Sequence, residues 1–279
     1  MRHYLSVCAI FKDEGRYLRE WIAFHRLVGV EHFYLYDNGS TDDSRQAVAE
    51  AAPAAAITLL DWPPHPGQIP AYDHCLRHHG RDSRWLAFLD IDEFMFSPEV
   101  DDFRVLLRDY EAHPGLAMTW VEFGASGHRI PPPGYVTHNY LRRARAGFTI
   151  AFPQMLRRPG LDPAVLANYY PQSAHVKMAI DPSRALRCLN AHRFEFAGGA
   201  PAVTETGLPM RTNWSDQPSI TRTRINHYWS KSLAEFEAKL ARGRSDIVEP
   251  YDPDFAHRKL AHLDAVFDDT ILALARRLP

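Results

Sequence analysis

The sequence predicts an α/β fold in which a mostly parallel central sheet is flanked by helices. Strand-like and helix-like segments alternate over the first hundred residues, and this alternation is typical of parallel strands joined by crossover helices. The 279 residues are enough to bury a sizeable core in one large domain. Hydrophobic residues make up 46% of the chain and charged residues 24%, which is ordinary for a globular protein.

Four apolar segments in the first hundred residues predict buried strands, and the three segments between them predict helices. In the first helix the apolar side chains share one face, Asp13 can cap the N-terminus, and Gly29 stands where helices commonly end on glycine. Ligands bind such sheets at the carboxyl ends of the strands, where polar clusters follow the first, second and fourth strands. The strands are expected over 4–11, 32–36, 56–61 and 85–92, and the helices over roughly 14–28, 41–50 and 69–79.

The second half of the chain is less regular. Residues 116–123 predict a further strand, and the many prolines and glycines of 124–220 predict loops and short strands. Ser232 and Glu235 form a capping box that begins a helix. A last pair of helices is expected over 254–277.

Charge and cysteine usage exclude several classes of protein. Lys and Arg total 32 and Asp and Glu total 34, so a generally basic nucleic-acid-binding protein is excluded. No apolar stretch is long enough for a transmembrane helix, and the N-terminal apolar run lacks the features of a signal peptide. The three cysteines are far apart and form no CxxC, which favours reduced thiols in a cytoplasmic protein. Peripheral association with a membrane stays open.

The strongest chemical motif is Asp90-Ile91-Asp92 at the end of an apolar strand. Side chains alternate along a strand, so both carboxylates are expected to face one edge of the sheet. Hard oxygen ligands held together in this way suit Mg²⁺ or Mn²⁺, commonly shared with a substrate diphosphate. The alternative is an ordinary solvated strand end.

A second motif is His227-Tyr228-Trp229-Ser230-Lys231. A neutral imidazole at His227 can complete a metal site, and Lys231 can neutralise a phosphate as a point charge. The chain holds 27 arginines and only five lysines, so a lysine in a polar motif is informative. The alternative is a packed or surface histidine, of which the chain has many.

Polar side chains after the first two strands can contact a ribose or a base edge. The alternative for Asp13, Thr41 and Asp42 is simple helix capping. GxGxxG, Walker A and GxSxG patterns are absent, which excludes a dinucleotide fingerprint, a P-loop and a nucleophile elbow. The candidate nucleotide contacts are Lys12, Asp13, Glu14, Asp37 and Asn38.

Several longer motifs together resemble family 92-like glycosyltransferases, whose domain was long described as of unknown function 23, and their bacterial family 2-like relatives. The resemblance is dense over 4–128 and 225–243 and weak between them. It is carried by FKDEGRYLREWIAFHRLVGVEHFYLYDNGSTDD, by Gln68…Ala71-Tyr72…Cys75-Leu76, and by RWLAFLDIDEF, FGASGH and INHYWSKSLAEFEAKLARG.

This resemblance implies a GT-A fold and a nucleotide-sugar donor. It also implies a divalent metal (Mn²⁺ or Mg²⁺), inversion at the anomeric carbon, and a glycan or other glycoconjugate acceptor. Several members of the family use UDP-galactose, so a UDP-sugar is the expected donor. We expect one GT-A domain over 1–279, with a nucleotide-sugar-binding half over 1–100 and an acceptor-binding half over 101–279.

The resemblance also implies roles for individual residues, position by position. Asp90, Asp92 and His227 are similar to the residues that hold the metal. The nucleotide contacts implied are Lys12, Asp13 and Glu14 after the first strand, Asp37 and Asn38 after the second, and Lys231 at the diphosphate.

No motif identifies the general base, and Glu122 is the candidate. It lies on the strand before the FGASGH loop, and Trp120 on the same face is expected to raise its pKa by shielding it from water. The alternative is a salt bridge from Glu122 to an arginine such as Arg129. Competing candidates are His128, Glu195, Glu205 and Asp216.

Two other functions remain open at this stage. A nucleotidyltransferase or metal phosphohydrolase could use the same acidic strand ends, and would release pyrophosphate or free sugar. A non-catalytic nucleotide-sugar-binding module is the other alternative, although intact Asp90, Asp92, His227 and Lys231 count against it.

Overall fold

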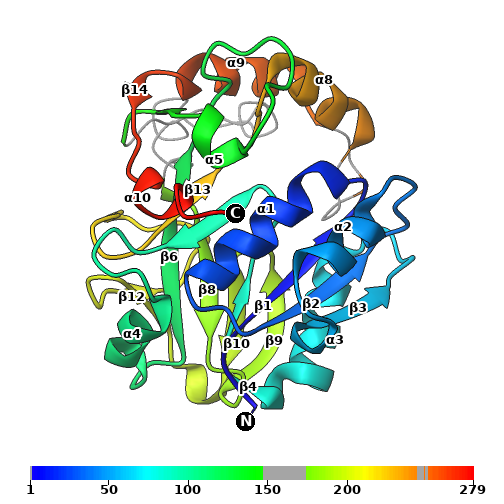
Figure 1. Cartoon of the computed structure of the whole chain (residues 1–279). Helices are drawn as coiled ribbons and strands as arrows, with labels where there is room; N and C mark the ends of the chain where they lie inside the picture. Colours follow the sequence, from blue (N-terminus) through cyan, green and yellow to red (C-terminus); the bar gives the residue numbers. More distant parts are fainter. Residues whose placement is uncertain (1, 147–173, 244–247, 249–250) are drawn as a thin grey trace.

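A ten-stranded sheet runs through the middle of the molecule, with helices packed against it (Figure 1). The computed structural model describes residues 2–146, 174–243, 248 and 251–279. Along the sheet the strand order is β12-β11-β6-β8-β4-β1-β2-β3, and β13 pairs with both β6 and β5. The predicted α/β architecture, a central sheet flanked by helices, is confirmed.

The first half of the chain alternates strands and helices as the sequence predicts. The strands pair in parallel in the order β3-β2-β1-β4. The elements are β1 (His3–Phe11), α1 (Gly15–Leu27), β2 (His32–Asp37), α2 (Ser44–Ala51), β3 (Ile57–Asp61), α3 (Gln68–His79) and β4 (Ser83–Phe88), with short 3-10 turns η1 (Ala54–Ala56) and η2 (Gly80–Asp82).

Alternation along β1 divides the core between the two faces of the sheet. Leu5 and Val7 pack in one cluster with Trp21 of α1, whereas Cys8 packs in a second cluster with Tyr72 of α3. Successive side chains of a strand point to opposite faces, so a strand with both faces buried is apolar throughout. This is why the run at 4–11 is continuous rather than alternating.

The second half extends the sheet with strands of both directions. Strand β8 is antiparallel to both β4 and β6, so the parallel order predicted for the first half does not continue. The elements are β5 (Glu93–Phe96), α4 (Phe103–Leu107), η3 (Arg108–Tyr110), β6 (Gly115–Glu122), α5 (Val136–Asn139), β7 (Arg142–Arg143), β8 (Val176–Ile180), β9 (Ala185–Asn190), β10 (Arg193–Phe196), η5 (Ala197–Gly199), β11 (Ala202–Thr204), β12 (Pro209–Met210), β13 (Arg224–His227), α8 (Leu233–Arg242), α9 (Pro253–Leu263), β14 (Val266–Phe267) and α10 (Leu272–Ala275).

Two boundaries differ from the sequence prediction. The strand expected over 85–92 ends at Phe88, and Asp90 and Asp92 lie in the tight turn between β4 and β5. The Glu93 carboxylate accepts a hydrogen bond from the Asp90 N–H at 2.9 Å and so stabilises the turn. The argument that the two aspartates share one face of a strand is therefore wrong. The helix pair expected over 254–277 is α9 followed by β14 and the short α10.

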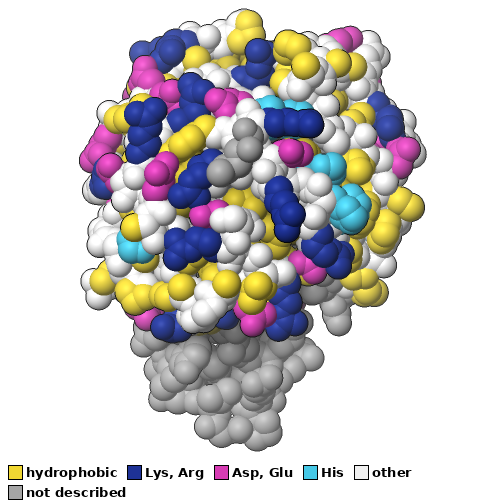
Figure 2. Space-filling model, turned by 90° about the horizontal axis from the view of Figure 1, so that it is seen from below, with side chains coloured by type: hydrophobic (Ala, Val, Ile, Leu, Met, Phe, Trp, Pro, Cys, Tyr) yellow, Lys and Arg dark blue, Asp and Glu magenta, His cyan; other side chains and the backbone are white. Residues whose placement is uncertain are grey.

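The surface matches the nearly balanced charge of the sequence. Basic and acidic side chains are interspersed over the face shown in Figure 2. Among the described residues, no helix is long and apolar enough to cross a membrane. Cys8, Cys75 and Cys188 are free and buried, as predicted.

One buried ion-pair network fixes β13, the strand that carries His227. Asp268 accepts from Arg224 of β13 at 3.0 Å and from Arg143 of β7 at 2.6 Å. Burial opposes ionisation, but Arg224, Thr270 and Arg143 outweigh it and lower the pKa of Asp268 to about 2. Because the pKa is lower in the folded state, this carboxylate stabilises the fold above its unfolded pKa, and that stability is lost as the pH falls towards 2.

We therefore expect Asp268→Asn to lower the free energy of unfolding at pH 7 by about 2 kcal/mol, because each unit of pKa shift corresponds to about 1.4 kcal/mol. The deficit relative to wild type should shrink as the pH falls from 4 to 2. Urea titrations at pH 7 and pH 3 measure it, and equal stability at pH 7 would contradict this role for Asp268.

Candidate functional site

Three chain segments meet where β1, β4 and β13 end. Strand β1 lies between β2 and β4, so the order of the strands along the sheet reverses at β1. The Leu89 N–H donates to the Cys8 carbonyl at 3.1 Å, and the Tyr228 N–H donates to the Asp92 carbonyl at 2.8 Å. In open α/β sheets, ligands bind at such a change of strand order.

Asp90 is held by side chains from two other elements. Its Oδ1 accepts from Gln68 Nε2 at 2.6 Å and from the Tyr72 hydroxyl at 3.2 Å, and its Oδ2 accepts from Lys177 Nζ at 3.0 Å. Lys177 is fully buried on β8 and also lies 3.5 Å from Glu93. Asp90 and Glu93 outweigh the burial of Lys177 and raise its pKa.

Asp92 has different neighbours from Asp90. Its Oδ2 accepts from Lys239 Nζ of α8 at 2.6 Å, while its Oδ1 lies 3.5 Å from His227 Nε2. Burial opposes ionisation of Asp92, but Lys239 and His227 outweigh it, and its pKa is held well below the usual range. The two aspartates of the motif are thus separately held, each by a lysine from a distant segment.

His227 lies between two carboxylates. It is paired in register with Glu122 across β13 and β6, and its Nδ1 lies 3.4 Å from Glu122 Oε2. Burial alone would lower the pKa of His227, but Glu122 and Asp92 outweigh it and raise that pKa to about 9. The ring of Trp120 packs against the imidazole with 4.3 Å between ring centroids.

Glu122 is buried and ion-paired. Its Oε1 accepts from Lys259 Nζ of α9 at 2.8 Å. Burial favours the neutral acid, but Lys259 and His227 outweigh it and lower the pKa of Glu122 to about 2. The expected rise in this pKa is therefore wrong, because Trp120 shields His227 and a lysine reaches the carboxylate. The cation is Lys259 rather than the Arg129 considered as an alternative.

The competing base candidates have other contacts. The Glu205 carboxylate accepts hydrogen bonds from the backbone of Thr221, Arg222 and Thr223, in the segment that follows Asp216. Glu195 pairs with Arg187 at 2.6 Å in the β9–β10 hairpin. His128 lies 3.2 Å from the Asn139 carbonyl. Asp216 itself is exposed.

Lys231 is a buried cation of another kind. It forms no ion pair or hydrogen bond with any described residue, and its ammonium lies 4.3 Å from the centroid of the Tyr17 ring. Burial lowers its pKa, although Glu14 and Asp92 are close enough to oppose this. Its φ of 51° is in the left-handed region, and Asp13 and Ser126 are the other described non-glycine residues there. Strained backbone of this kind clusters at functional sites.

The segment after β1 is tied to its neighbours. Asp13 Oδ1 accepts from the Thr41 N–H at 2.7 Å, and Asp42 accepts from the Gly15 N–H at 2.9 Å, so Asp42 rather than Asp13 caps α1. Glu14 pairs with Arg242 of α8 at 2.8 Å. The Lys12 side chain is exposed. Helix α8 therefore lies directly over the end of β1 (Figure 1).

Asp37 and Asn38 shape the next loop. Asp37 is buried, pairs with Arg45 at 2.9 Å and accepts from the Ser40 N–H at 2.8 Å. Asn38 donates to the carbonyls of Trp62 and Pro64 at 2.6 and 2.9 Å. Both side chains therefore hold the loop in shape, and no described contact joins them to the Asp92–His227 pair.

All five lysines of the chain lie at this site or beside it, and this was the signal in the sequence for the residues that motif reasoning missed. Lys177 contacts Asp90, Lys239 contacts Asp92 and Lys259 contacts Glu122. The other members are Lys231 and Lys12. The other 27 residues of the Lys and Arg total are arginines, so lysine occurs only in this region of the protein.

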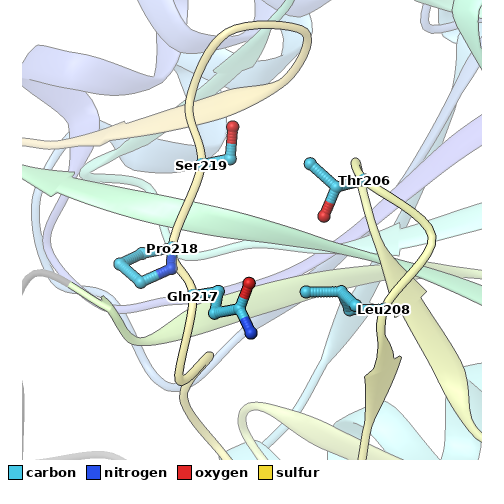
Figure 3. Close-up of a pocket in the computed structure, with 5 residues that line it drawn as sticks. All are labelled: Thr206, Leu208, Gln217, Pro218 and Ser219. Atoms are coloured by element: carbon cyan, nitrogen blue, oxygen red, sulfur yellow. The ribbon is translucent and has the colours of Figure 1, made fainter.

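A separate shallow pocket lies at the far edge of the sheet, beside β11 and β12 (Figure 3). Hydroxyl, amide and apolar side chains line it without an ionisable group, and they are Thr206, Leu208, Gln217, Pro218 and Ser219. Strand β11 pairs with β6 at Leu116 and Ala117, at the opposite end of β6 from Glu122, so this pocket is distinct from the lysine and carboxylate cluster.

The residues fit a divalent cation in part. Within the described ranges, no group of three or more His, Cys, Asp or Glu side chains is arranged to hold a metal ion. Asp92 Oδ1 and His227 Nε2 are suitable donors, 3.5 Å apart, while both oxygens of Asp90 are already hydrogen-bonded. Mg²⁺ is commonly held by one or two carboxylates together with substrate phosphates, so the donor set fits such a shared site.

Two solved structures have a low similarity to this chain. Glucosyl-3-phosphoglycerate synthase from Mycobacterium tuberculosis, in complex with Mg²⁺ and uridine diphosphate, has a TM-score of 0.36 and 15% identity, over 65% of this chain and 57% of that one. TarS of S. aureus has a TM-score of 0.33 and 13% identity, over 46% of this chain and 23% of that one.

Relatives identified by sequence have a higher identity to this chain than these two structures. A glycosyltransferase family 92 protein of Oryza sativa subsp. japonica is 32% identical over 149 residues, which are 52% of this chain and 25% of the relative. A family 92 protein of Ricinus communis is 30% identical over 148 residues, which are 50% of this chain and 26% of the relative. The chain thus spans about a quarter of the length of these relatives. The family model described as glycosyltransferase family 92 matches residues 3–257, and on this match the chain belongs to glycosyltransferase family 92.

Proposed function

We propose that this chain is a metal-dependent, inverting glycosyltransferase of the GT-A type. It would move a sugar from a UDP-sugar to a hydroxyl group of a glycan or other glycoconjugate. The observation that carries the proposal is the buried ammonium of Lys231, which has no anionic partner among the described residues and lies beside the Asp92–His227 pair. A buried cation without a partner is costly, and a diphosphate would supply the missing charge.

We propose that Asp92 and His227 hold the divalent cation and that Asp90 supports them from the same turn. Mn²⁺ or Mg²⁺ would supply positive charge to the leaving nucleoside diphosphate. The distance of 3.5 Å between Asp92 Oδ1 and His227 Nε2 supports this, because two donors on one cation lie roughly 3 Å apart. Lys177 pairs with Asp90 at 3.0 Å, and its contact with Glu93 holds the turn.

The residues after β1 and β2 are proposed to form the nucleoside side of the site. Lys12, Asp13 and Glu14 border the donor next to Lys231, and the loop of Asp37 and Asn38 borders the ribose or base. On this proposal residues 1–100 form most of the donor half and 101–279 the acceptor half, with Lys231 and α8 reaching back over the donor. The contact of Arg242 with Glu14 supports this arrangement.

The role of Glu122 as the general base stays a prediction, and the contacts of its side chain favour a different role. A base has to reach the acceptor hydroxyl, whereas the Glu122 side chain is 0% exposed and is held by Lys259 and His227. A carboxylate on the far nitrogen of a metal-binding imidazole fixes the tautomer and orientation of the ring. We therefore propose Glu122 as a positioning residue for His227.

A thermal-shift series tests the proposed donor. UDP, GDP, ADP and dTDP are each added with and without Mn²⁺, and we expect UDP with Mn²⁺ to raise the melting temperature most, because a ligand that binds only the folded state stabilises it by mass action. UDP-sugars that bind are then incubated with candidate acceptors. Release of pyrophosphate or free sugar in place of a transfer product would support one of the rival functions instead.

Lys231→Met should weaken UDP binding about ten- to a hundredfold and leave uridine binding nearly unchanged. The variant keeps the apolar stem against Tyr17 and removes a charge-assisted contact of about 1.5–3 kcal/mol. Isothermal titration calorimetry with UDP and with uridine measures the difference. Equal loss of affinity for both ligands would assign Lys231 to the shape of the pocket and not to the diphosphate.

A further inference from the structure

Lys239 occupies one of the two oxygens of the carboxylate that the proposed function gives to the divalent cation. Its Nζ donates to Asp92 Oδ2 at 2.6 Å and to the Trp229 carbonyl at 3.0 Å. Both side chains of the pair are largely buried, with 16% of Lys239 and 12% of Asp92 exposed. A buried pair of this kind is weakly screened by solvent, so each charge strongly affects what else the other can bind.

We propose that Lys239 is a built-in competitor of the divalent cation at Asp92, which keeps the affinity of the site for the cation low until an anionic donor arrives. This inference rests on the proposed metal site. Lys239 lies on α8, and the role proposed for it affects how the cation and the donor bind and not the chemical step.

The two carboxylate oxygens of Asp92 have different neighbours. Oδ2 accepts from Lys239, whereas Oδ1 faces His227 Nε2 at 3.5 Å. A cation between Oδ1 and His227 would share one carboxylate with an ammonium, and the two positive charges would repel each other. If the ammonium stays, it repels the cation, and if it leaves, its ion pair with Asp92 has to be broken. In both cases the affinity of Asp92 for the cation is lower.

Lys239 keeps a second hydrogen-bond acceptor if the cation binds Asp92. The Trp229 carbonyl accepts its second hydrogen bond, and the ring of Trp229 lies 5.6 Å from the ammonium. A diphosphate would bring negative charge that offsets the ammonium and the cation together. Cation and diphosphate would then bind with positive coupling, which is reciprocal by thermodynamic linkage.

The test measures Mn²⁺ binding without nucleotide, from the loss of the free Mn²⁺ signal in electron paramagnetic resonance. We expect Lys239→Met to bind Mn²⁺ at least about tenfold more tightly than wild type, because the competing charge is gone and the stem is retained. Adding Asp92→Asn to this variant should abolish the gain. Arg242→Met, one turn further along α8, removes a charge that pairs with Glu14 and should change Mn²⁺ affinity less than threefold.

An affinity of Lys239→Met for Mn²⁺ equal to or below that of the wild type would overturn the inference, as would an equal gain in Arg242→Met. Lys239→Gln, which keeps a donor for the Trp229 carbonyl, is the second variant if Lys239→Met does not fold. Mn²⁺ binding is read without a donor, so the two proposals fail separately. Tighter binding in Lys239→Met with no sugar transfer by wild type would remove the proposed function alone.

Discussion

Asp92→Asn is expected to lower the transfer rate by about 10²–10³-fold. The amide keeps the size of the side chain but removes the negative charge that the proposed cation requires, and loss of one fixed electrostatic contact in an active site typically has this magnitude. The rate is measured at saturating donor and Mn²⁺, so that weaker binding alone does not explain the loss. A variant that keeps most of its Mn²⁺-dependent rate would contradict Asp92 as a ligand.

The same substitution is also expected to destabilise the fold. The alternative of an ordinary solvated strand end does not hold for Asp92, which is largely buried between Lys239 and His227. Removing one partner of a buried ion pair commonly costs about 3–5 kcal/mol, because the other charge stays buried. The double variant Asp92→Asn with Lys239→Met should recover part of this stability without recovering transfer, and urea titration of the four proteins of the cycle measures it.

Glu122→Gln is expected to weaken Mn²⁺ binding about 10–100-fold and to lower the transfer rate in parallel. Partners on the far nitrogen of a metal-binding imidazole typically have effects of this size, since they orient the ring and raise its basicity. Glutamine keeps the shape of the side chain but leaves Lys259 without its buried counter-charge and leaves His227 with Asp92 alone. The affinity is measured from the free Mn²⁺ signal, and the rate over a range of pH.

The two possible roles of Glu122 predict different changes in Mn²⁺ affinity. Loss of a general base would lower the rate about 10²-fold with unchanged Mn²⁺ affinity, and the acidic limb of the pH–rate profile would disappear. A positioning residue would lose Mn²⁺ affinity, and high Mn²⁺ concentrations would restore part of the rate. Lys259→Met is a matched variant that leaves the Glu122 carboxylate in place, so it should affect Mn²⁺ affinity less than Glu122→Gln.

The alternation of strands and helices in the first hundred residues could be predicted because each element is marked locally. The apolar run of β1 is continuous since both of its faces are buried, and Gly29, with φ of 99°, ends α1 where the pattern places it. The capping box of Ser232 and Glu235 begins α8 as predicted. Strand β8 could not be placed between β4 and β6 because no local pattern specifies a long-range antiparallel partner.

The motifs identified the residues of the candidate site but not their contacts. Asp90, Asp92 and His227 stand out because polar side chains follow apolar strands, and Lys231 stands out because lysine is rare in this chain. The sequence could not show that Asp90 and Asp92 lie in a turn and are held by different lysines. It also misassigned the surroundings of Glu122, whose pKa is lowered and not raised.

By itself, the sequence determined the α/β class, the edge of the sheet at which the candidate site lies, and the family to which the chain belongs. Only the tertiary structure decided which charges meet there. Lys177, Lys239 and Lys259 come from three segments that lie 87, 147 and 137 residues from the carboxylates they contact. Propensity and periodicity report on neighbours a few residues apart, whereas the pairing of buried charges depends on packing between distant elements, where low solvent exposure makes each ion pair strong.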